Sequence, residues 1–162
     1  GHSVQESIRN GIEYLVDVAA DDDIVVIHDG IRPLADSAVL TDVIRVCRKY
    51  GNAVTSLPYN EPIFVVSDDD PDTTTQYIPR ETLRRVSTPQ AYRYGKLRGV
   101  YKKAFDLGIG IDGSSYTNTL MVDMGERLHF AQGSDKNIKL TTKEDLELFK
   151  AYLTEDSDSW LK

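Results

Sequence analysis

One short run of residues constrains the fold of this chain more than any other. Residues 24–27 are all apolar and are predicted to form a strand buried on both faces, and the sequence His-Asp-Gly-Ile-Arg-Pro follows at 28–33. In an open α/β sheet, ligands bind just beyond the carboxyl ends of the strands. We therefore expect Asp29 and Arg32 to lie at the edge of a site that suits a metal-bound phosphate. The alternative is a helix-capping Asp29 followed by a surface Arg32.

The chain otherwise alternates between helix and strand patterns. Apolar spacing behind a Ser3–Glu6 capping box predicts a helix over 4–19, and a second helix is expected from Ser37 to Gly51. The remaining expected elements are strands over 53–57, 127–131 and 137–140, and helices over 92–107 and from 141 onward. Short connections between them indicate an α/β fold with a Rossmann-like, mainly parallel sheet covered on both faces.

Residues 61–80 interrupt this alternation. The strand-like runs 63–66 and 76–78 flank an acidic, Thr-rich segment that contains Pro71, a pattern that predicts a β-hairpin with a long loop. A protruding hairpin exposes apolar edge strands that a monomer has to protect. We expect this arm to mediate dimerisation, and the alternative is a hairpin that folds back on its own sheet.

Composition limits the class of protein and its partners. The 162 residues amount to a single domain, 1–162, large enough to bury about 70% of its unfolded surface. The single cysteine, Cys47, lies in an apolar helical pattern and is expected to be a core thiol in a reducing compartment. The net charge of −7 argues against nucleic acid as a partner, and no apolar run approaches the ~20 residues of a membrane span. A cytoplasmic location follows from these features.

Four motifs stand in a fixed order along the chain. They cover residues 1–11 (GHSVQESIRNG), 28–33 (HDGIRP), 86–90 (VSTPQ) and 137–146 (NIKLTTKEDL). Together they resemble the cytidylyltransferases that activate sugar-alcohol phosphates, whose two best-known branches use 2-C-methyl-D-erythritol 4-phosphate or ribitol 5-phosphate. Members of this family open with a glycine-rich loop that binds the triphosphate of CTP, and this sequence has no such run. We therefore expect an amino-terminally truncated domain that is inactive alone.

The resemblance implies a reaction and a set of roles. In the family, a phosphate oxygen of the sugar alcohol attacks the α-phosphorus of CTP and pyrophosphate leaves. The resemblance further implies Mg²⁺ as cofactor and a homodimer whose arms, residues 61–80, reach into the partner's site. The matching positions are Arg80 and Lys139 as catalytic residues, Arg32, Thr88 and Gly30 for the acceptor, Gly1, His2, Ser7 and Asp29 for the nucleotide, and Asp29 for the metal.

Two positions depart from the family pattern. His2 stands where the family often has an acidic or small polar residue, which leaves the base contact open. Glu61 and Pro62 stand where many members have an Asp-Thr pair, and proline offers neither the hydroxyl nor an N–H. We therefore favour ribitol 5-phosphate over methylerythritol phosphate as acceptor. His28 is expected to be a hydrogen-bonded core residue facing away from Asp29. A non-catalytic dimerising or regulatory module with the same fold is the alternative function.

Overall fold

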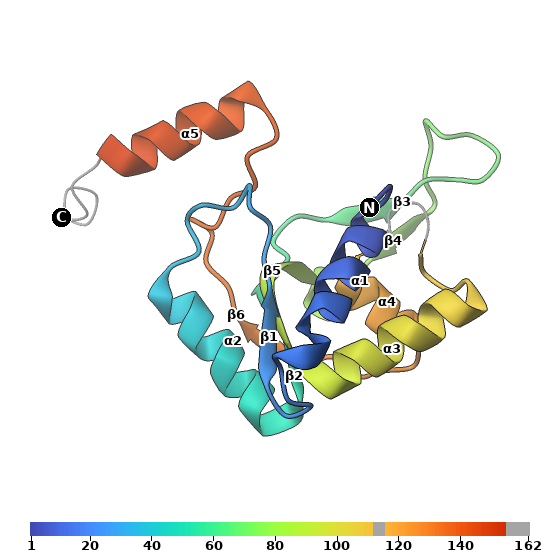
Figure 1. The fold of residues 1–162 in the computed structure, drawn as a ribbon. Coiled ribbons are helices and arrows are strands. Elements are labelled where there is room, and N and C mark those ends of the chain that lie inside the picture. The colour runs from blue at the N-terminus through green and yellow to red at the C-terminus, as the bar shows by residue number, and fades with distance from the viewer. Residues whose placement is uncertain (112–115, 155–162) are drawn as a thin grey trace.

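A four-stranded mixed sheet lies at the centre of the computed structural model, which describes residues 1–111 and 116–154 (Figure 1). Its strands are β1 (Ile24–Ile27), β5 (Arg84–Arg93), β2 (Asn52–Pro58) and β6 (Phe130–Gln132), in that spatial order. β5 runs antiparallel to both β1 and β2, whereas β6 is parallel to β2. Three of the four strands therefore point the same way, which confirms the α/β class, and the sheet is mixed because β5 is reversed.

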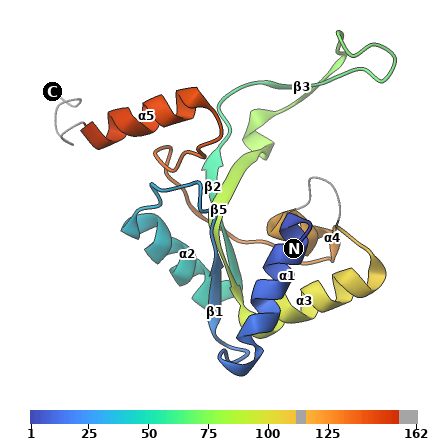
Figure 2. The same ribbon diagram turned by 45° about the horizontal axis from the view of Figure 1, so that its top comes forward.

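Helices cover both faces of the sheet (Figure 2). On one face, α2 (Ser37–Tyr50) packs Val43, Val46 and Cys47 against small residues of the strands. On the other face, a larger apolar cluster joins α1 (Val4–Tyr14), α3 (Tyr94–Leu107) and α4 (Thr117–Asp123) to the sheet. Neighbouring residues of β5 enter different clusters, Ala91 the first and Tyr92 the second, because successive side chains of a strand point to opposite faces.

The ends of α2 follow from its sequence. The Asp36 carboxylate accepts a hydrogen bond from the Val39 N–H at 2.9 Å and so caps the first turn. Gly51 ends the helix with φ 88°, a left-handed conformation that glycine adopts without steric cost. Cys47 is fully buried on this helix, which confirms it as a core thiol.

The strand β5 was not expected from the sequence. A helix was expected over 92–107, whereas a ten-residue strand spans Arg84–Arg93 and α3 begins at Tyr94. A proline inside a strand pattern argues against a strand because it cannot donate to the ladder. Here the β2–β5 register shifts between Val54 and Thr55, and the β1 ladder stops at Gln90, so Pro89 faces no position that requires its N–H.

Three other elements differ from expectation. Residues 137–140 are not a strand, since their backbone is held by contacts to the 28–33 segment instead, with the Leu140 N–H donating to the Ile31 carbonyl at 2.8 Å. Of the strand expected over 127–131, only β6 at Phe130–Gln132 forms. The first helix ends at Tyr14 and continues as the short 3₁₀ turn η1 (Leu15–Asp17).

The predicted hairpin is confirmed. β3 (Ile63–Val65) pairs antiparallel with β4 (Gln76–Ile78) in a separate two-stranded sheet, which projects from the body of the molecule (Figure 2). The turn η2 (Arg80–Thr82) follows at its base. Phe64 and Tyr77 face each other across the hairpin and are 59% and 68% exposed, so the arm carries a large apolar surface without cover in the described chain.

The last described helix, α5 (Lys143–Thr154), also projects from the sheet, and none of its residues is buried. Its first turn is capped by the Asp145 carboxylate, which accepts hydrogen bonds from the backbone N–H groups of Thr141 and Thr142. These N–H groups lower the pKa of Asp145 to about 2. Across residues 1–111 and 116–154, no helix is long and apolar enough to cross a membrane.

Packing of α3 gives a direct stability test. Leu97 is fully buried in the larger cluster, whereas Leu107 on the same helix is 57% exposed. We expect Leu97→Ala to lower the free energy of unfolding by about 2–5 kcal/mol, because it removes buried methyl groups and leaves a cavity. Leu107→Ala should change it by less than about 0.5 kcal/mol. Urea unfolding followed by circular dichroism measures both, and equal effects would contradict the described core.

Candidate active site

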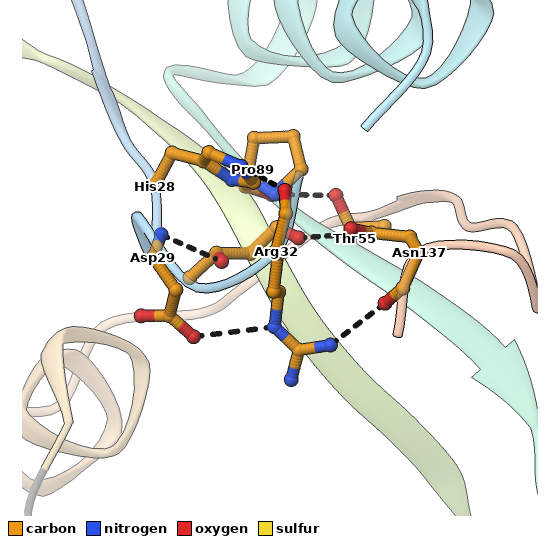
Figure 3. Close-up of polar contacts among 7 residues, drawn as sticks. His28, Asp29, Arg32, Thr55, Pro89 and Asn137 are labelled. Carbon is orange, nitrogen blue, oxygen red and sulfur yellow. Dashed lines mark hydrogen bonds and ion pairs between the residues drawn. The ribbon is translucent and has the colours of Figure 1, made fainter. Parts of the chain in front are cut away.

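The 28–33 segment meets two distant parts of the chain at one edge of the sheet (Figure 3). It follows the carboxyl end of β1, while residues 133–140 follow the carboxyl end of β6. The middle of β5, from Ser87 to Pro89, runs between them. This confirms that three of the four motifs, which lie far apart in sequence, come together where α/β proteins bind ligands.

Thr88 joins the three segments. Its hydroxyl oxygen accepts a hydrogen bond from the Asp29 backbone N–H at 3.0 Å, and its carbonyl accepts one from the Asn137 side-chain amide at 2.7 Å. Thr88 and Asn137 are both buried. Thr88 therefore fixes the backbone at Asp29, and its own hydroxyl proton stays available for an acceptor atom.

Arg32 is held between the same two neighbours. Its Nε donates to the Asp29 carboxylate at 3.2 Å, and Nη1 donates to the Asn137 carbonyl at 2.8 Å. Only 16% of its side chain is exposed. In Figure 3 the remaining nitrogen, Nη2, points away from these partners. The guanidinium is therefore oriented before any ligand binds, with donors still available.

Asn137 is a site residue that sequence reasoning missed. It was noted only as part of the motif at 137–146, yet its side-chain nitrogen and its carbonyl bind Thr88 and Arg32. Its side-chain oxygen Oδ1 is buried and has no hydrogen-bond partner among residues 1–111 and 116–154. Its place in the motif, two residues before Lys139, was the available signal, whereas the burial that requires partners for its amide is seen only in the structure.

The expectation that His28 is a core residue is wrong. His28 is exposed, and its Nε2 atom forms a hydrogen bond of 2.9 Å with the Arg32 carbonyl. The strand ends at Ile27, so His28 already belongs to the turn and not to the buried ladder. Its contact with Arg32 stabilises the turn, and the Arg32 N–H donates to the Asp29 carbonyl at 3.0 Å within the same turn.

A pocket of about 240 Å³ opens beside Arg32, on a wall that includes Lys139 and Asn137. The Lys139 ammonium lies 5.9 Å from the ring centroid of Tyr116, just before α4. A larger groove of about 820 Å³ lies along the first turns of α2. Since that groove contains none of the site residues expected from the sequence, the smaller pocket is the better candidate.

The Asp29 carboxylate has one oxygen bound to Arg32. The described residues donate no hydrogen bond to its other oxygen, and 35% of the side chain is exposed. No group of three or more His, Cys, Asp or Glu residues in the described ranges forms a closed metal cage. This arrangement fits Mg²⁺, which is commonly held by one or two carboxylates together with substrate phosphates and water.

Of the other expected site residues, Arg80 lies apart from this cluster, whereas Gly30 lies in the same turn as Asp29 and Arg32. Arg80 is 57% exposed at the base of the arm, where it donates to the Asn60 carbonyl at 3.1 Å and pairs with Glu81 at 3.5 Å. Gly30 is exposed, and a Cβ built on it would meet no atom within 4 Å. The chain itself therefore does not require a glycine there, and only a closely bound ligand would.

The expected nucleotide residues gather at the start of α1. A Cβ on Gly1 would lie 2.6 Å from the Ser7 nitrogen, so the chain passes too close to the helix for a side chain at this position. The His2 N–H donates to the Glu6 carboxylate, and the Ser7 hydroxyl donates to the Ser3 carbonyl at 3.0 Å. These residues form one compact turn, with no contact to the Asp29–Thr88 cluster.

A buried polar network holds that turn against α3 and α4. Tyr101 donates to the Gln5 side-chain oxygen at 2.7 Å and lies 2.8 Å from the Thr117 hydroxyl, and the Gln5 amide donates to the Gly110 carbonyl at 3.2 Å. Burial raises the pKa of Tyr101 to about 12, so its hydroxyl stays protonated at neutral pH. The network fixes the expected nucleotide segment relative to α3 and to the start of α4.

Known proteins resemble this chain over nearly its whole length. The family model "IspD: 2-C-methyl-D-erythritol 4-phosphate cytidylyltransferase" matches residues 1–155. A ribitol-5-phosphate cytidylyltransferase of Lacticaseibacillus paracasei is 61% identical over 155 residues, which are 96% of this chain and 65% of that protein. A 2-C-methyl-D-erythritol 4-phosphate cytidylyltransferase of Syntrophotalea carbinolica is 36% identical over 159 residues, 98% of this chain and 64% of that protein.

Solved structures give the same result. The crystal structure of 2-C-methyl-D-erythritol 4-phosphate cytidylyltransferase from Thermus thermophilus superposes with a TM-score of 0.78 at 25% identity, covering 94% of this chain and 70% of that one. The chain spans just under two thirds of the length of the two relatives above, 65% and 64%. From the four motifs, the clustered site, the fold and the match over residues 1–155, the chain belongs to the IspD family.

Proposed function

We propose that this protein transfers a cytidylyl group from CTP to a sugar-alcohol phosphate, with ribitol 5-phosphate as the acceptor and the cytoplasm as its compartment. The observation that carries the proposal is the cluster of Asp29, Arg32, Thr88 and Asn137 at the carboxyl edge of the sheet, with Lys139 in the adjoining pocket. Family membership supports the same reaction class.

The proposed reaction is a direct displacement. An oxygen of the acceptor phosphate forms a bond to the α-phosphorus of CTP, and the bond from that phosphorus to the bridging oxygen of the β-phosphate breaks. The bonding electrons leave with pyrophosphate, and no bond to the protein forms. Such a reaction depends on positioning two anions in line and on balancing their charge.

The oriented guanidinium of Arg32 serves to position the substrate. Because Asp29 and Asn137 already fix its plane, little side-chain entropy is lost when its free N–H groups bind a substrate oxygen. The Thr88 hydroxyl proton can donate to the same substrate. Gly30, in the adjacent turn, lets a ligand approach the backbone closely.

We assign the metal to Asp29, whose carboxylate has one oxygen without a protein donor in the described chain. Bound Mg²⁺ would supply charge neutralisation at the phosphates of CTP. The nucleotide itself is assigned to the turn at Gly1, His2 and Ser7, which the buried Tyr101 network keeps rigid.

Lys139 and Arg80 are assigned to the reacting phosphates. Lys139 lines the pocket beside Arg32. Arg80 sits at the base of the arm instead, outside the cluster, and we assign it to the site of a partner subunit to which the arm would cross. The exposed Phe64 and Tyr77 supply apolar surface for such a homodimer.

Ribitol 5-phosphate is the acceptor that two observations favour. Pro62, exposed at the base of the arm, offers no hydroxyl to an acceptor. The relative with 61% identity is a ribitol-5-phosphate cytidylyltransferase, whereas the methylerythritol enzyme reported above shares 36%. A non-catalytic dimerising module is not favoured, because such a module has no need of an oriented arginine beside a lysine-lined pocket.

Replacement of Asp29 tests the reaction. In the encoded protein supplied with Mg²⁺, CTP and ribitol 5-phosphate, Asp29→Asn should lower kcat by a factor of ~10² or more, because charge stabilisation at the transferring phosphorus is lost. Asp22→Asn, an exposed acid before β1, is the matched control and should keep wild-type turnover. Pyrophosphate release measures both, and near-normal turnover of Asp29→Asn would refute the assignment.

Subunit mixing tests the shared site. If Arg80 acts in the partner's site, a heterodimer of Arg80→Ala and Asp29→Asn subunits holds one site with both residues intact. Random exchange of equal amounts should then restore about a quarter of wild-type activity, since half of the dimers are mixed and each has one good site of two. Failure to recover activity, with exchange verified by mass spectrometry, would place both residues in one subunit's site.

A further inference from the structure

Arg85 lies on the pocket beside Arg32, although no motif pointed to it. It is the second residue of β5, and it lines the 240 Å³ pocket together with Arg32 and Lys139. Its guanidinium forms an ion pair with Asp135, in the segment that follows β6. Three cationic side chains thus converge on one small pocket, in a protein whose net charge is −7.

Two carboxylates, those of Asp135 and Asp145, also line this pocket, but the basic side chains still attract an anionic ligand. Asp145 binds three donors of Thr141 and Thr142 at the start of α5, so its charge serves that helix end. Asp29 pairs with Arg32 from outside the pocket wall. Asp135 therefore remains as the carboxylate paired with Arg85, and its side chain is 78% exposed.

The Arg85–Asp135 pair can open at little cost. Arg85 is 56% exposed, and exposed ion pairs contribute about 0–1 kcal/mol because water screens them and two long side chains lose freedom. A phosphate group carries more charge than a carboxylate and offers a guanidinium two parallel hydrogen bonds. A phosphate entering this pocket would therefore displace Asp135 from Arg85.

The size of the pocket decides which phosphate fits. Pockets for drug-sized ligands range from about 300 to 1,000 Å³, and a pocket of 240 Å³ lies below that range. It suits a phosphate with a short polar chain. The hydroxyls of Ser87 and Ser134 on its wall match such a chain, since each both donates and accepts hydrogen bonds.

We propose that Arg85 is an additional acceptor-binding residue, which exchanges its ion pair with Asp135 for the phosphate of the sugar-alcohol phosphate. This inference rests on the proposed function and adds a residue to its acceptor site. Asp135 then competes with the substrate for Arg85, so the two members of one ion pair have opposite effects on acceptor affinity. If the pair had only a structural role, replacing either residue would change the acceptor affinity in the same direction.

Steady-state kinetics of paired variants test this directly. Arg85→Gln should raise the KM for ribitol 5-phosphate about 10-fold or more, through loss of a charged hydrogen-bond donor, and leave the KM for CTP within about 2-fold. Asp135→Asn should leave the acceptor KM unchanged or lower it. Arg85→Lys should recover part of the loss, because it restores charge without the planar fork.

Arg84 provides the matched control. It is the neighbouring arginine on β5, faces the opposite side of the strand and does not line the pocket, so Arg84→Gln should leave both KM values unchanged. Thermal unfolding of both glutamine variants should stay near wild type. An acceptor KM that rises equally in Arg85→Gln and Asp135→Asn, or a rise confined to the KM for CTP, would overturn the inference.

A binding measurement separates this inference from the proposed function. Calorimetric titration of ribitol 5-phosphate, in the presence of a non-reactive CTP analogue, should show Arg85→Gln weakening the Kd by the same factor as the KM. If wild type binds in this way but forms no CDP-ribitol, the proposed function fails and Arg85 keeps its role. If wild type turns over or binds and Arg85→Gln changes neither KM nor Kd, Arg85 has no role in binding.

Discussion

Two hydrogen bonds at Thr88 hold together the cluster of Asp29, Arg32 and Asn137 in the candidate site. One fixes the backbone at Asp29, and the other fixes Asn137, whose carbonyl in turn holds Arg32. Thr88 and Asn137 are buried, so breaking the bond between them leaves a polar atom without a partner at a cost of about 1–3 kcal/mol. A residue on the central strand thereby orders two loops that are separated by more than one hundred positions in the chain.

Charge is distributed in a way that serves anionic ligands. The chain is acidic overall, with a net charge of −7, yet Arg32, Arg85 and Lys139 share one small pocket. Electrostatic attraction at a site is local, because salt screens exposed charges beyond about 8–10 Å. The acidic surface therefore does not prevent phosphate binding in the pocket. Because binding to a nucleic-acid backbone needs a basic surface, we expect this acidic protein to have no affinity for nucleic acid.

Some parts of the structure could be predicted from sequence because the signals were local. The Gly51 end of α2, the Ser3 cap of α1 and the hairpin at 61–80 each depend on a few neighbouring residues. The position of Asp29 and Arg32 at an edge of the sheet was expected from the general position of ligands in α/β sheets.

Other parts depended on partners that sequence does not show. β5 contains Pro89, and its strand conformation is possible because the β2 ladder shifts register opposite that residue. His28 is exposed because β1 stops one residue before it. Asn137 and Arg85 gain their roles from Thr88 and from the pocket, which are contacts between distant segments. Contacts between distant segments therefore determine the features that local sequence patterns did not predict.

The central claim is cytidylyl transfer to a straight-chain sugar-alcohol phosphate, and a competition between acceptors tests it most directly. The encoded protein is given Mg²⁺, CTP and equal concentrations of ribitol 5-phosphate and 2-C-methyl-D-erythritol 4-phosphate, and the CDP-alcohols are separated and quantified against pyrophosphate. Because Pro62 offers no hydroxyl to the acceptor, we predict CDP-ribitol as the main product, formed one-to-one with pyrophosphate. Preferential formation of the methylerythritol product, or no CDP-alcohol at all, would contradict the account.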